Sequence, residues 1–219
     1  MYFKAVLKWL FRLIGFITAF PVQLIFFKRK VINQSGLPRK ELFRGGALVI
    51  SNHYNVLDYA NNLFIALPRF LGVAASEMPY RNWFLRWGMS VFNGIEVDRE
   101  HKSMRFIDDC AEAVARGQLI QIFPESRNTP DGEMHPFKTS YLMIALRSGA
   151  DILPIVTDGN YGFFKRTHVV LGQRIPVSSL FENDHPTREE ITAANEKVFA
   201  VMLAMKELAD GSRAGKEGS

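Results

Sequence analysis

The chain has 219 residues, of which 47% are hydrophobic and 22% are charged, a composition typical of a folded protein. This length suits one catalytic domain with an appendage rather than two full domains. The net charge of +5 favours anionic partners such as phosphate esters or acidic lipid surfaces. Because the sequence has no zinc-ligand spacing, no RNA-binding sheet signature and no recognition-helix pattern, we expect no nucleic-acid partner.

The first 32 residues predict a membrane-associated helical segment. Lys4, Lys8 and Arg12 recur every four positions and would form one basic stripe on a helix. An uncharged run follows at 13–27, is rich in phenylalanine and contains Pro21. As a helix this run would reach only ~22 Å, against a hydrocarbon core of ~30 Å.

A proline inside the run and basic residues on both flanks predict two short helices that dip into one leaflet. A single spanning helix and a helical hairpin packed on the core remain alternatives. The basic cluster at 28–30 and the lack of a cleavable-signal pattern favour the cytoplasmic face of a membrane.

Beyond this segment, short apolar runs alternate with amphipathic stretches. The alternation predicts an α/β domain over 33–208, with a mostly parallel mixed sheet flanked by helices, and it allows antiparallel pairing of the last strands. The predicted strands are 47–51, 71–76, 94–97, 118–123, 151–156 and 168–172. The predicted helices are 58–67, 82–90, 103–116, 141–148 and 188–208. Residues 209–219 are rich in glycine, serine and charge, which predicts a disordered tail.

The segment SNHYNVLD follows the first of these strands, where α/β proteins commonly bind ligands. His53 and Asp58 are five residues apart, so on one continuous helix they would diverge by about 140°. They can meet only if a helix begins between them. The carboxylate would then accept a hydrogen bond from Nδ1 and leave Nε2 free to take a proton from an alcohol. Taken alone, the pair also fits a surface histidine beside a helix-capping aspartate.

Two further segments carry cations near predicted strand ends. GIEVDRE contains a predicted strand that ends in Asp98 and Arg99. The planar guanidinium of Arg99 suits a phosphate, although an ordinary solvated strand end explains it equally well. The loop FPESRNTPDGEMHPFK holds Glu125, Arg127 and Lys138. We expect Lys138 to lie in the first turn of a helix, whose amide groups would gather a phosphate together with the two cations.

The fourth segment, DILPIV, places Pro154 inside an apolar strand. A proline there fits an edge strand or a bulge, because it cannot donate a ladder hydrogen bond, and a purely structural strand is an equally good reading. The single cysteine, Cys110, excludes an internal disulfide and a cysteine-based metal cluster. Its helical surroundings predict a small buried side chain.

The ordered set NHYNVLD, GIEVDR, FPESR…PFK and ILPIV resembles the four blocks of the glycerolipid acyltransferase family, typified by 1-acylglycerol-3-phosphate acyltransferase. The resemblance runs from about residue 48 to residue 156. It implies that His53 is a general base, that Asp58 orients it, and that Asn52 supports them. It also implies that Arg99, with Gly94 at the start of its block, binds the phosphate of the acceptor.

The third block departs from the family pattern. Most members have F-P-E-G-T-R, whereas this chain has FPESR, with Ser126 at the glycine position and one residue fewer. The resemblance still implies that Arg127 and Lys138 bind phosphate and that Glu125 supports the site. The departure bears on the acceptor pocket rather than on the reaction. In the fourth block Pro154 is the marker, and that block is associated with acyl-donor or structural roles.

The resemblance implies transfer of a fatty acyl group from acyl-CoA or an acyl-carrier protein to the sn-2 hydroxyl of 1-acylglycerol 3-phosphate, giving phosphatidic acid. The chain has no G-x-S-x-G elbow, so a direct transfer without an acyl-enzyme is expected. No metal and no resident cofactor are implied. Alternatives are acylation of glycerol 3-phosphate or of another lysophospholipid or lipid acceptor, hydrolysis of the thioester, and membrane binding without catalysis.

Overall fold

The structure, a computed structural model, describes residues 2–26, 28–76, 78–97, 104–129, 131–183 and 185–214. The strands are β1 (Arg29–Asn33), β2 (Ala47–Ser51), β3 (Leu71–Ser76), β4 (Ile95–Val97), β5 (Leu119–Ile122), β6 (Ile152–Thr157) and β7 (Thr167–Leu171). The helices are α1 (Tyr2–Phe26), α2 (Arg39–Leu42), α3 (Leu57–Ala66), α4 (Met78–Arg81), α5 (Trp83–Val91), α6 (Arg105–Ala115), α7 (Ser140–Ser148) and α8 (Arg188–Ala214), with a 3-10 turn η1 (Val177–Ser179).

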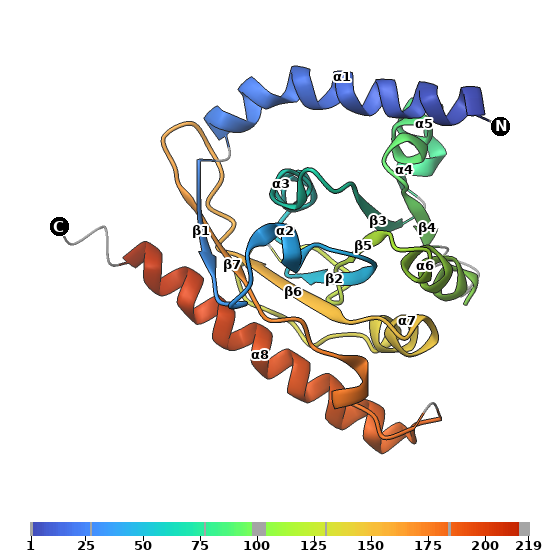
Figure 1. Cartoon of the computed structure of the whole chain (residues 1–219). Coiled ribbons are helices and arrows are strands. Elements are labelled where there is room, and N and C mark those ends of the chain that lie inside the picture. The colour runs from blue at the N-terminus through green and yellow to red at the C-terminus, as the bar shows by residue number, and fades with distance from the viewer. Residues whose placement is uncertain are drawn as a thin grey trace.

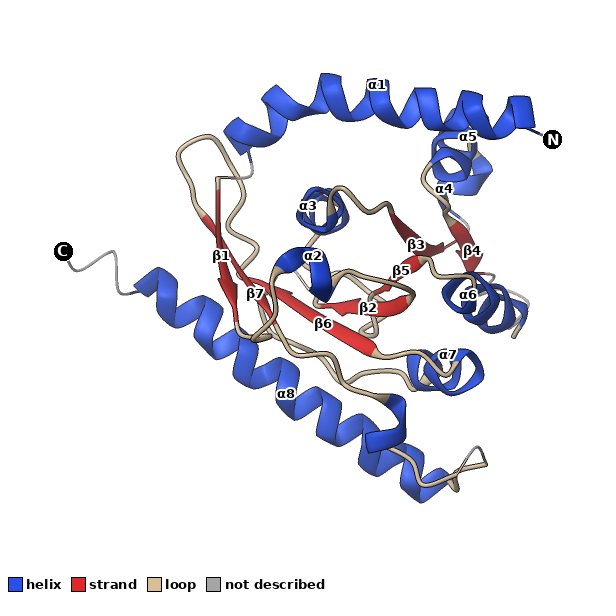
Figure 2. Cartoon of the chain, viewed as in Figure 1, coloured by secondary structure: helices blue, strands red, loops and turns tan. Residues whose placement is uncertain are grey.

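The strands form one sheet in the order β1-β7-β6-β2-β5-β3-β4, with helices on both faces (Figure 1; Figure 2). Neighbouring strands pair in parallel, except for β6 and β7, which are antiparallel. The prediction of an α/β domain with a mostly parallel mixed sheet is therefore confirmed. In this order β2 and β6 are neighbours, so the chain segments that follow them meet at one end of the sheet.

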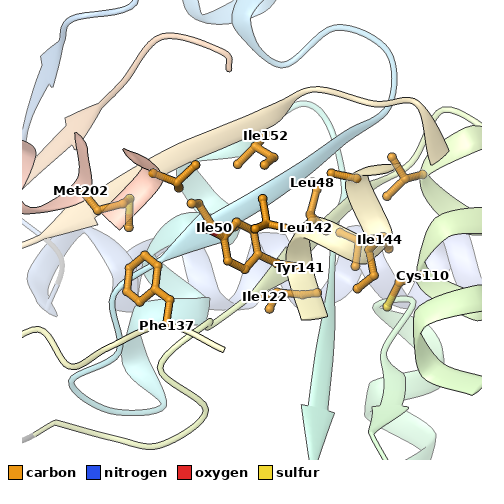
Figure 3. Packing of buried hydrophobic residues seen from close by; sticks show 14 of the residues in the cluster. Leu48, Ile50, Cys110, Ile122, Phe137, Tyr141, Leu142, Ile144, Ile152 and Met202 are labelled. Atoms are coloured by element: carbon orange, nitrogen blue, oxygen red, sulfur yellow. The ribbon is translucent and has the colours of Figure 1, made fainter. Parts of the chain in front are cut away.

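Both faces of β2 are buried, as expected for a parallel strand covered by helices on two sides. Leu48 and Ile50 face the layer of α6, α7 and α8, whereas Ala47 and Val49 face α2 and α3. Figure 3 shows the first of these layers, in which Tyr141 of α7 lies fully buried among aliphatic side chains. Packing on both faces fixes the position of β2, and with it the segment that begins at Asn52.

The N-terminal segment differs from the two short helices that the sequence predicts. Residues 2–26 form one helix, α1, with Pro21 inside it. A proline removes one backbone hydrogen bond, and here the helix continues for five residues beyond it. In the part of the chain that the structure describes, no helix is both long and apolar enough to cross a bilayer.

The domain boundary expected at residue 32 is wrong, because residues 29–32 lie in β1 and pair in parallel with β7. This strand is short and carries two charges, and its partner lies far along the chain. The predicted disordered tail is wrong for 209–214, where α8 continues and Ala209 is fully buried. Residues 215–219 lie outside the described part.

Of the readings that the sequence allows for Pro154, an edge strand does not apply, because β6 lies between β7 and β2. The missing N–H is tolerated because Pro154 sits where the ladder with β7 ends. There its carbonyl accepts a hydrogen bond from the Gly172 amide (3.0 Å). A Cβ at Gly172 would lie 2.7 Å from Cγ of Pro154 and 2.8 Å from Sδ of Met205, so a glycine is needed opposite the proline.

Substitution of Gly46, which precedes β2, tests how tightly this strand is held. A Cβ at Gly46 would lie 2.1 Å from the Val114 carbonyl oxygen, a backbone atom that cannot rotate away. We expect Gly46→Ala to lower the free energy of unfolding by ~1–3 kcal/mol in urea denaturation. Gly88→Ala is the control, because Gly88 lies in α5 with open space around it. Alanine there should be neutral or stabilising, and equal losses in the two variants would contradict this account.

Candidate active site

His53 and Asp58 meet at the carboxyl end of β2. Helix α3 begins at Leu57, which lies between them, as their spacing requires. His53 Nδ1 lies 3.0 Å from Asp58 Oδ2, and the Asp58 side chain is fully buried whereas that of His53 is 17% exposed. A carboxylate on Nδ1 favours the tautomer with a proton on that atom. Nε2 is then the ring nitrogen that can accept a proton from another molecule.

Asp58 receives two further hydrogen bonds. The Asn55 amide donates to Oδ2 at 2.7 Å, and the Tyr161 hydroxyl donates to Oδ1 at 2.6 Å. Burial, together with the charge of Asp58, raises the pKa of Tyr161 well above its usual value, so this hydroxyl stays protonated and acts as the donor. Tyr161 lies in the loop after β6, beyond the four sequence blocks. Sequence reasoning missed it, because a lone tyrosine in a loop carries no motif.

The His53 ring and backbone are held by the loop that follows β5. Phe123 stacks on the imidazole with ring centroids 3.8 Å apart. The His53 carbonyl accepts hydrogen bonds from the Thr129 amide (2.8 Å) and hydroxyl (3.0 Å). The His53 amide donates to Glu125 Oε1 at 3.1 Å. The position of the imidazole therefore depends on the FPESR segment.

Glu125 is buried and joins two loops through backbone amides. Its second oxygen, Oε2, accepts from the His135 amide at 3.1 Å. Burial raises the pKa of Glu125, and the two amide hydrogen bonds oppose that rise by stabilising the carboxylate. The next residue, Ser126, has φ +60°, in the left-handed region that glycine adopts most easily. This conformation gives a physical reason for glycine at the corresponding position of the family block.

Asn52 connects the ends of two neighbouring strands. Its Nδ2 donates to the Thr157 carbonyl (2.8 Å), and its Oδ1 accepts from the Thr157 amide (3.0 Å). The side chain thus continues the hydrogen bonding between β2 and β6 beyond the end of β2. Because Thr157 and Tyr161 belong to the same end of β6, Asn52 aligns the His53 segment with the segment that carries the Tyr161 hydroxyl.

Arg127 and Lys138 are both exposed on the loop that follows β5. Arg127 Nη2 lies 2.9 Å from His135 Nδ1, and His135 Nε2 lies 3.3 Å from Asp131 Oδ2. His135 and His53 bind the same carboxylate through their amides, so Arg127 is joined to the His53 segment through Glu125.

The helix expected to open at 137–138 begins instead at Ser140. Phe137 is buried against Phe199 of α8, with centroids 4.9 Å apart, and this packing takes it out of the helix. The Lys138 amide donates to the Pro124 carbonyl (2.9 Å) rather than facing a ligand. The Lys138 side chain is exposed, and it lies two residues before the helix rather than in its first turn.

The second block contributes Arg99 and Gly94 to the predicted site. Arg99 lies outside the residues that the structure describes. Gly94 precedes β4, and a Cβ there would lie 2.6 Å from Cε of Met89 and 2.7 Å from the Tyr80 hydroxyl. Close packing at the sheet edge therefore accounts for this glycine.

A cavity of about 570 Å³ opens beside Tyr54, the residue that follows His53. Tyr54 packs on Gly159, where a Cβ would lie 2.6 Å from Cγ of the tyrosine ring. The lining carries three cations and three carboxylates, so its charge does not select an anion. They are Lys165, Lys206 and Arg213, and Asp131, Asp158 and Asp210.

Removal of the Tyr161 hydroxyl tests the support of Asp58. Tyr161→Phe leaves a buried carboxylate oxygen without its donor, so we expect a loss of ~1–3 kcal/mol in the free energy of unfolding. Tyr141→Phe is the matched control, because that hydroxyl donates to the neutral amide oxygen of Asn195 at 2.9 Å. Denaturant titration of both variants should show the larger loss at Tyr161, and the reverse order would contradict a charged Asp58.

A model of the acyltransferase family matches residues 28–158. The 1-acyl-sn-glycerol-3-phosphate acyltransferase of Limnanthes alba is 28% identical over 121 residues, which cover 52% of this chain and 42% of that protein. The human 1-acyl-sn-glycerol-3-phosphate acyltransferase beta is 24% identical over 163 residues, covering 68% and 58%. The chain thus spans about half the length of these curated relatives.

The crystal structure of the 1-acyl-sn-glycerophosphate acyltransferase PlsC from Thermotoga maritima has a similar fold. The TM-score is 0.60 at 20% identity, over 82% of this chain and 72% of that one. The family match extends over more than half of this chain and includes both the β2–α3 junction and the FPESR loop. This chain therefore belongs to the acyltransferase family.

Proposed function

We propose that the chain transfers a fatty acyl group from acyl-CoA or an acyl-carrier protein to the sn-2 hydroxyl of 1-acylglycerol 3-phosphate, giving phosphatidic acid. The observation that carries this proposal is the contact between His53 Nδ1 and the buried Asp58 carboxylate, which leaves Nε2 for the substrate. The relatives from Limnanthes alba and human are named as 1-acyl-sn-glycerol-3-phosphate acyltransferases, which supports 1-acylglycerol 3-phosphate as the acceptor.

In this reaction His53 Nε2 takes the proton of the acceptor hydroxyl as its oxygen attacks the thioester carbonyl. The tetrahedral intermediate collapses, the carbon–sulfur bond breaks, and the imidazolium returns the proton to the leaving thiolate. Asp58 stabilises the imidazolium and keeps the ring in place, while Tyr161 and the Asn55 amide hold the carboxylate.

The state of Cys110 supports direct transfer. Its side chain is fully buried in α6, and burial raises the pKa of the thiol to about 12. A thiolate is therefore disfavoured at the only cysteine of the chain, which leaves it unsuited to act as an acyl-carrying nucleophile.

Membrane association through α1 completes the proposal. This helix exposes large apolar side chains along its length, including Trp9, Ile17 and Leu24, together with the basic Lys8. A helix with these properties suits the interface of a bilayer, where the lipid acceptor resides. The exposed Lys28 and Lys30, after the helix, favour the anionic cytoplasmic face.

The decisive experiment follows thiol release from acyl-CoA by the detergent-purified protein, with and without lysophosphatidate. We expect release to require the acceptor and to fall by about 10²–10⁴-fold in His53→Ala, because the general base is lost. His185→Ala is the control, since His185 is exposed and distant in sequence from the four blocks.

Other results of this assay would favour one of the alternative functions. Thiol release with glycerol 3-phosphate or another lysophospholipid, and not with lysophosphatidate, would show that lysophosphatidate is not the acceptor. It would still support acyl transfer as the reaction. Release that ignores every acceptor would indicate a thioesterase. Inactivity with both CoA and carrier-protein donors, while lipid binding survives loss of His53, would indicate a membrane-binding protein without catalysis.

The same assay tests the cations that we propose for the acceptor phosphate, namely Arg127, Lys138 and Arg99. We expect Lys138→Ala and Arg127→Ala each to raise KM for lysophosphatidate by about tenfold with a smaller change in kcat, because a charge-assisted contact to phosphate is lost. Lys40→Ala, an exposed cation on α2, should leave both constants unchanged. An unchanged KM in both site variants would reject their role.

A further inference from the structure

The loop between β6 and β7 exposes two phenylalanines at its tip. Phe164 is fully exposed and Phe163 is 52% exposed. Lys165 and Arg166 follow at once and are also exposed, and the chain has no acidic residue from 159 to 167. An aromatic pair beside two cations suits the boundary between lipid headgroups and acyl chains, where rings lie in the apolar layer and cations meet anionic headgroups.

Hydrogen bonds within the loop connect its two sides. The Thr167 hydroxyl donates to the Asn160 carbonyl (3.0 Å), and Asn160 Nδ2 donates to the Arg166 carbonyl (3.3 Å). The Lys165 amide donates to the Gly162 carbonyl (3.2 Å). The exposed rings are therefore presented by a closed, braced loop.

The tip lies on the same side of the molecule as α1. Figure 1 shows the loop rising from the sheet toward that side, with α5 beneath the other end of α1. Helix α5 contacts α1 through the Trp87–Phe11 pair, with centroids 4.9 Å apart, and Trp83 there is 79% exposed. Three segments that are distant in sequence thus lie toward one side of the molecule, and each carries exposed aromatic side chains.

We infer that the tip at 162–166 inserts into an anionic lipid surface and forms a second membrane contact beside α1. A protein partner fits less well, because two rings on a narrow loop offer far less than the roughly 800 Å² per partner that a specific protein interface buries. A lipid surface needs no such area, since the loop adds to the contact already proposed for α1, and each cation contributes separately to binding anionic lipid.

The same loop reaches the candidate active site. Tyr161, two residues before Phe163, donates its hydroxyl to Asp58. Insertion of the tip therefore brings the His53–Asp58 pair to the bilayer surface from which a lipid acceptor must enter. The inference rests on the proposed membrane association, but it does not depend on the reaction.

The test uses fluorescence at single positions. Cys110 is the only cysteine and is buried, so Phe164→Cys provides one reactive surface thiol for an environment-sensitive maleimide dye. Ser178→Cys is the matched control, because Ser178 is exposed in η1, after the opposite end of β7. Both proteins are mixed with vesicles of phosphatidylglycerol and phosphatidylcholine, some of which carry brominated acyl chains as quenchers.

We expect the dye at position 164, and not the dye at 178, to shift to shorter wavelength and to be quenched by the brominated chains. Both proteins should sediment equally with the vesicles. If they sediment but the two dyes behave alike, the loop contact is wrong and membrane association through α1 stands. If neither protein sediments, both proposals are wrong. A shift that follows protein concentration without lipid would indicate self-association and overturn the inference.

A variant without a dye gives an independent measure. Phe163→Ser combined with Phe164→Ser should weaken binding to the anionic vesicles by about tenfold or more, because two rings that would be buried in the lipid are removed. Leu37→Ser, which removes an exposed apolar side chain between β1 and α2, is the control and should bind as the unmodified chain does. Equal binding by all three proteins would overturn the inference.

Discussion

A buried carboxylate is costly unless donors meet its oxygens, and Asp58 satisfies this condition with groups from two distant segments. His53 and the Asn55 amide reach one oxygen, and the Tyr161 hydroxyl reaches the other. The first two belong to the β2–α3 junction, whereas the third comes from the loop after β6. Asp58 is therefore fully supported only when β2 and β6 lie side by side. The geometry that leaves His53 Nε2 for a substrate is thus a property of the completed sheet.

Glu125 is a second buried carboxylate that needs hydrogen-bond donors. Its donors are the backbone amides of His53 and His135, so it positions the backbone of two loops rather than a side chain. Amides cannot move independently of the chain. A carboxylate held between two of them therefore fixes the spacing of the loops after β2 and β5. Together with the ring of Phe123 on the imidazole, this contact explains how a loop one residue shorter than the family pattern still frames His53.

The loop between β6 and β7 has an inner and an outer side. Tyr161 points its hydroxyl at Asp58, while Phe164, three residues later, is exposed. This arrangement places polar support for the His53–Asp58 pair next to an apolar tip. The proposed function would use both features, because catalytic groups need ordered polar partners while a lipid acceptor stays in an apolar phase. Helix α1 and helix α5 lie toward the same side of the molecule as this loop, and both carry exposed aromatic side chains.

The sequence by itself determined the features that depend on neighbouring residues. Apolar runs predicted the strands that carry the site, and the five-residue interval between His53 and Asp58 required a helix to begin between them. Only the tertiary structure decided features that depend on distant pairing. Strand β1 forms because β7 offers an edge to it, α8 extends to Ala214 while Ala209 packs in the core, and β6 accepts Pro154 opposite Gly172. Tyr161 carries no motif, and its role follows from the fold. Periodicity reports the local conformation of a chain, whereas the partners of a buried group are set by which segments share a sheet.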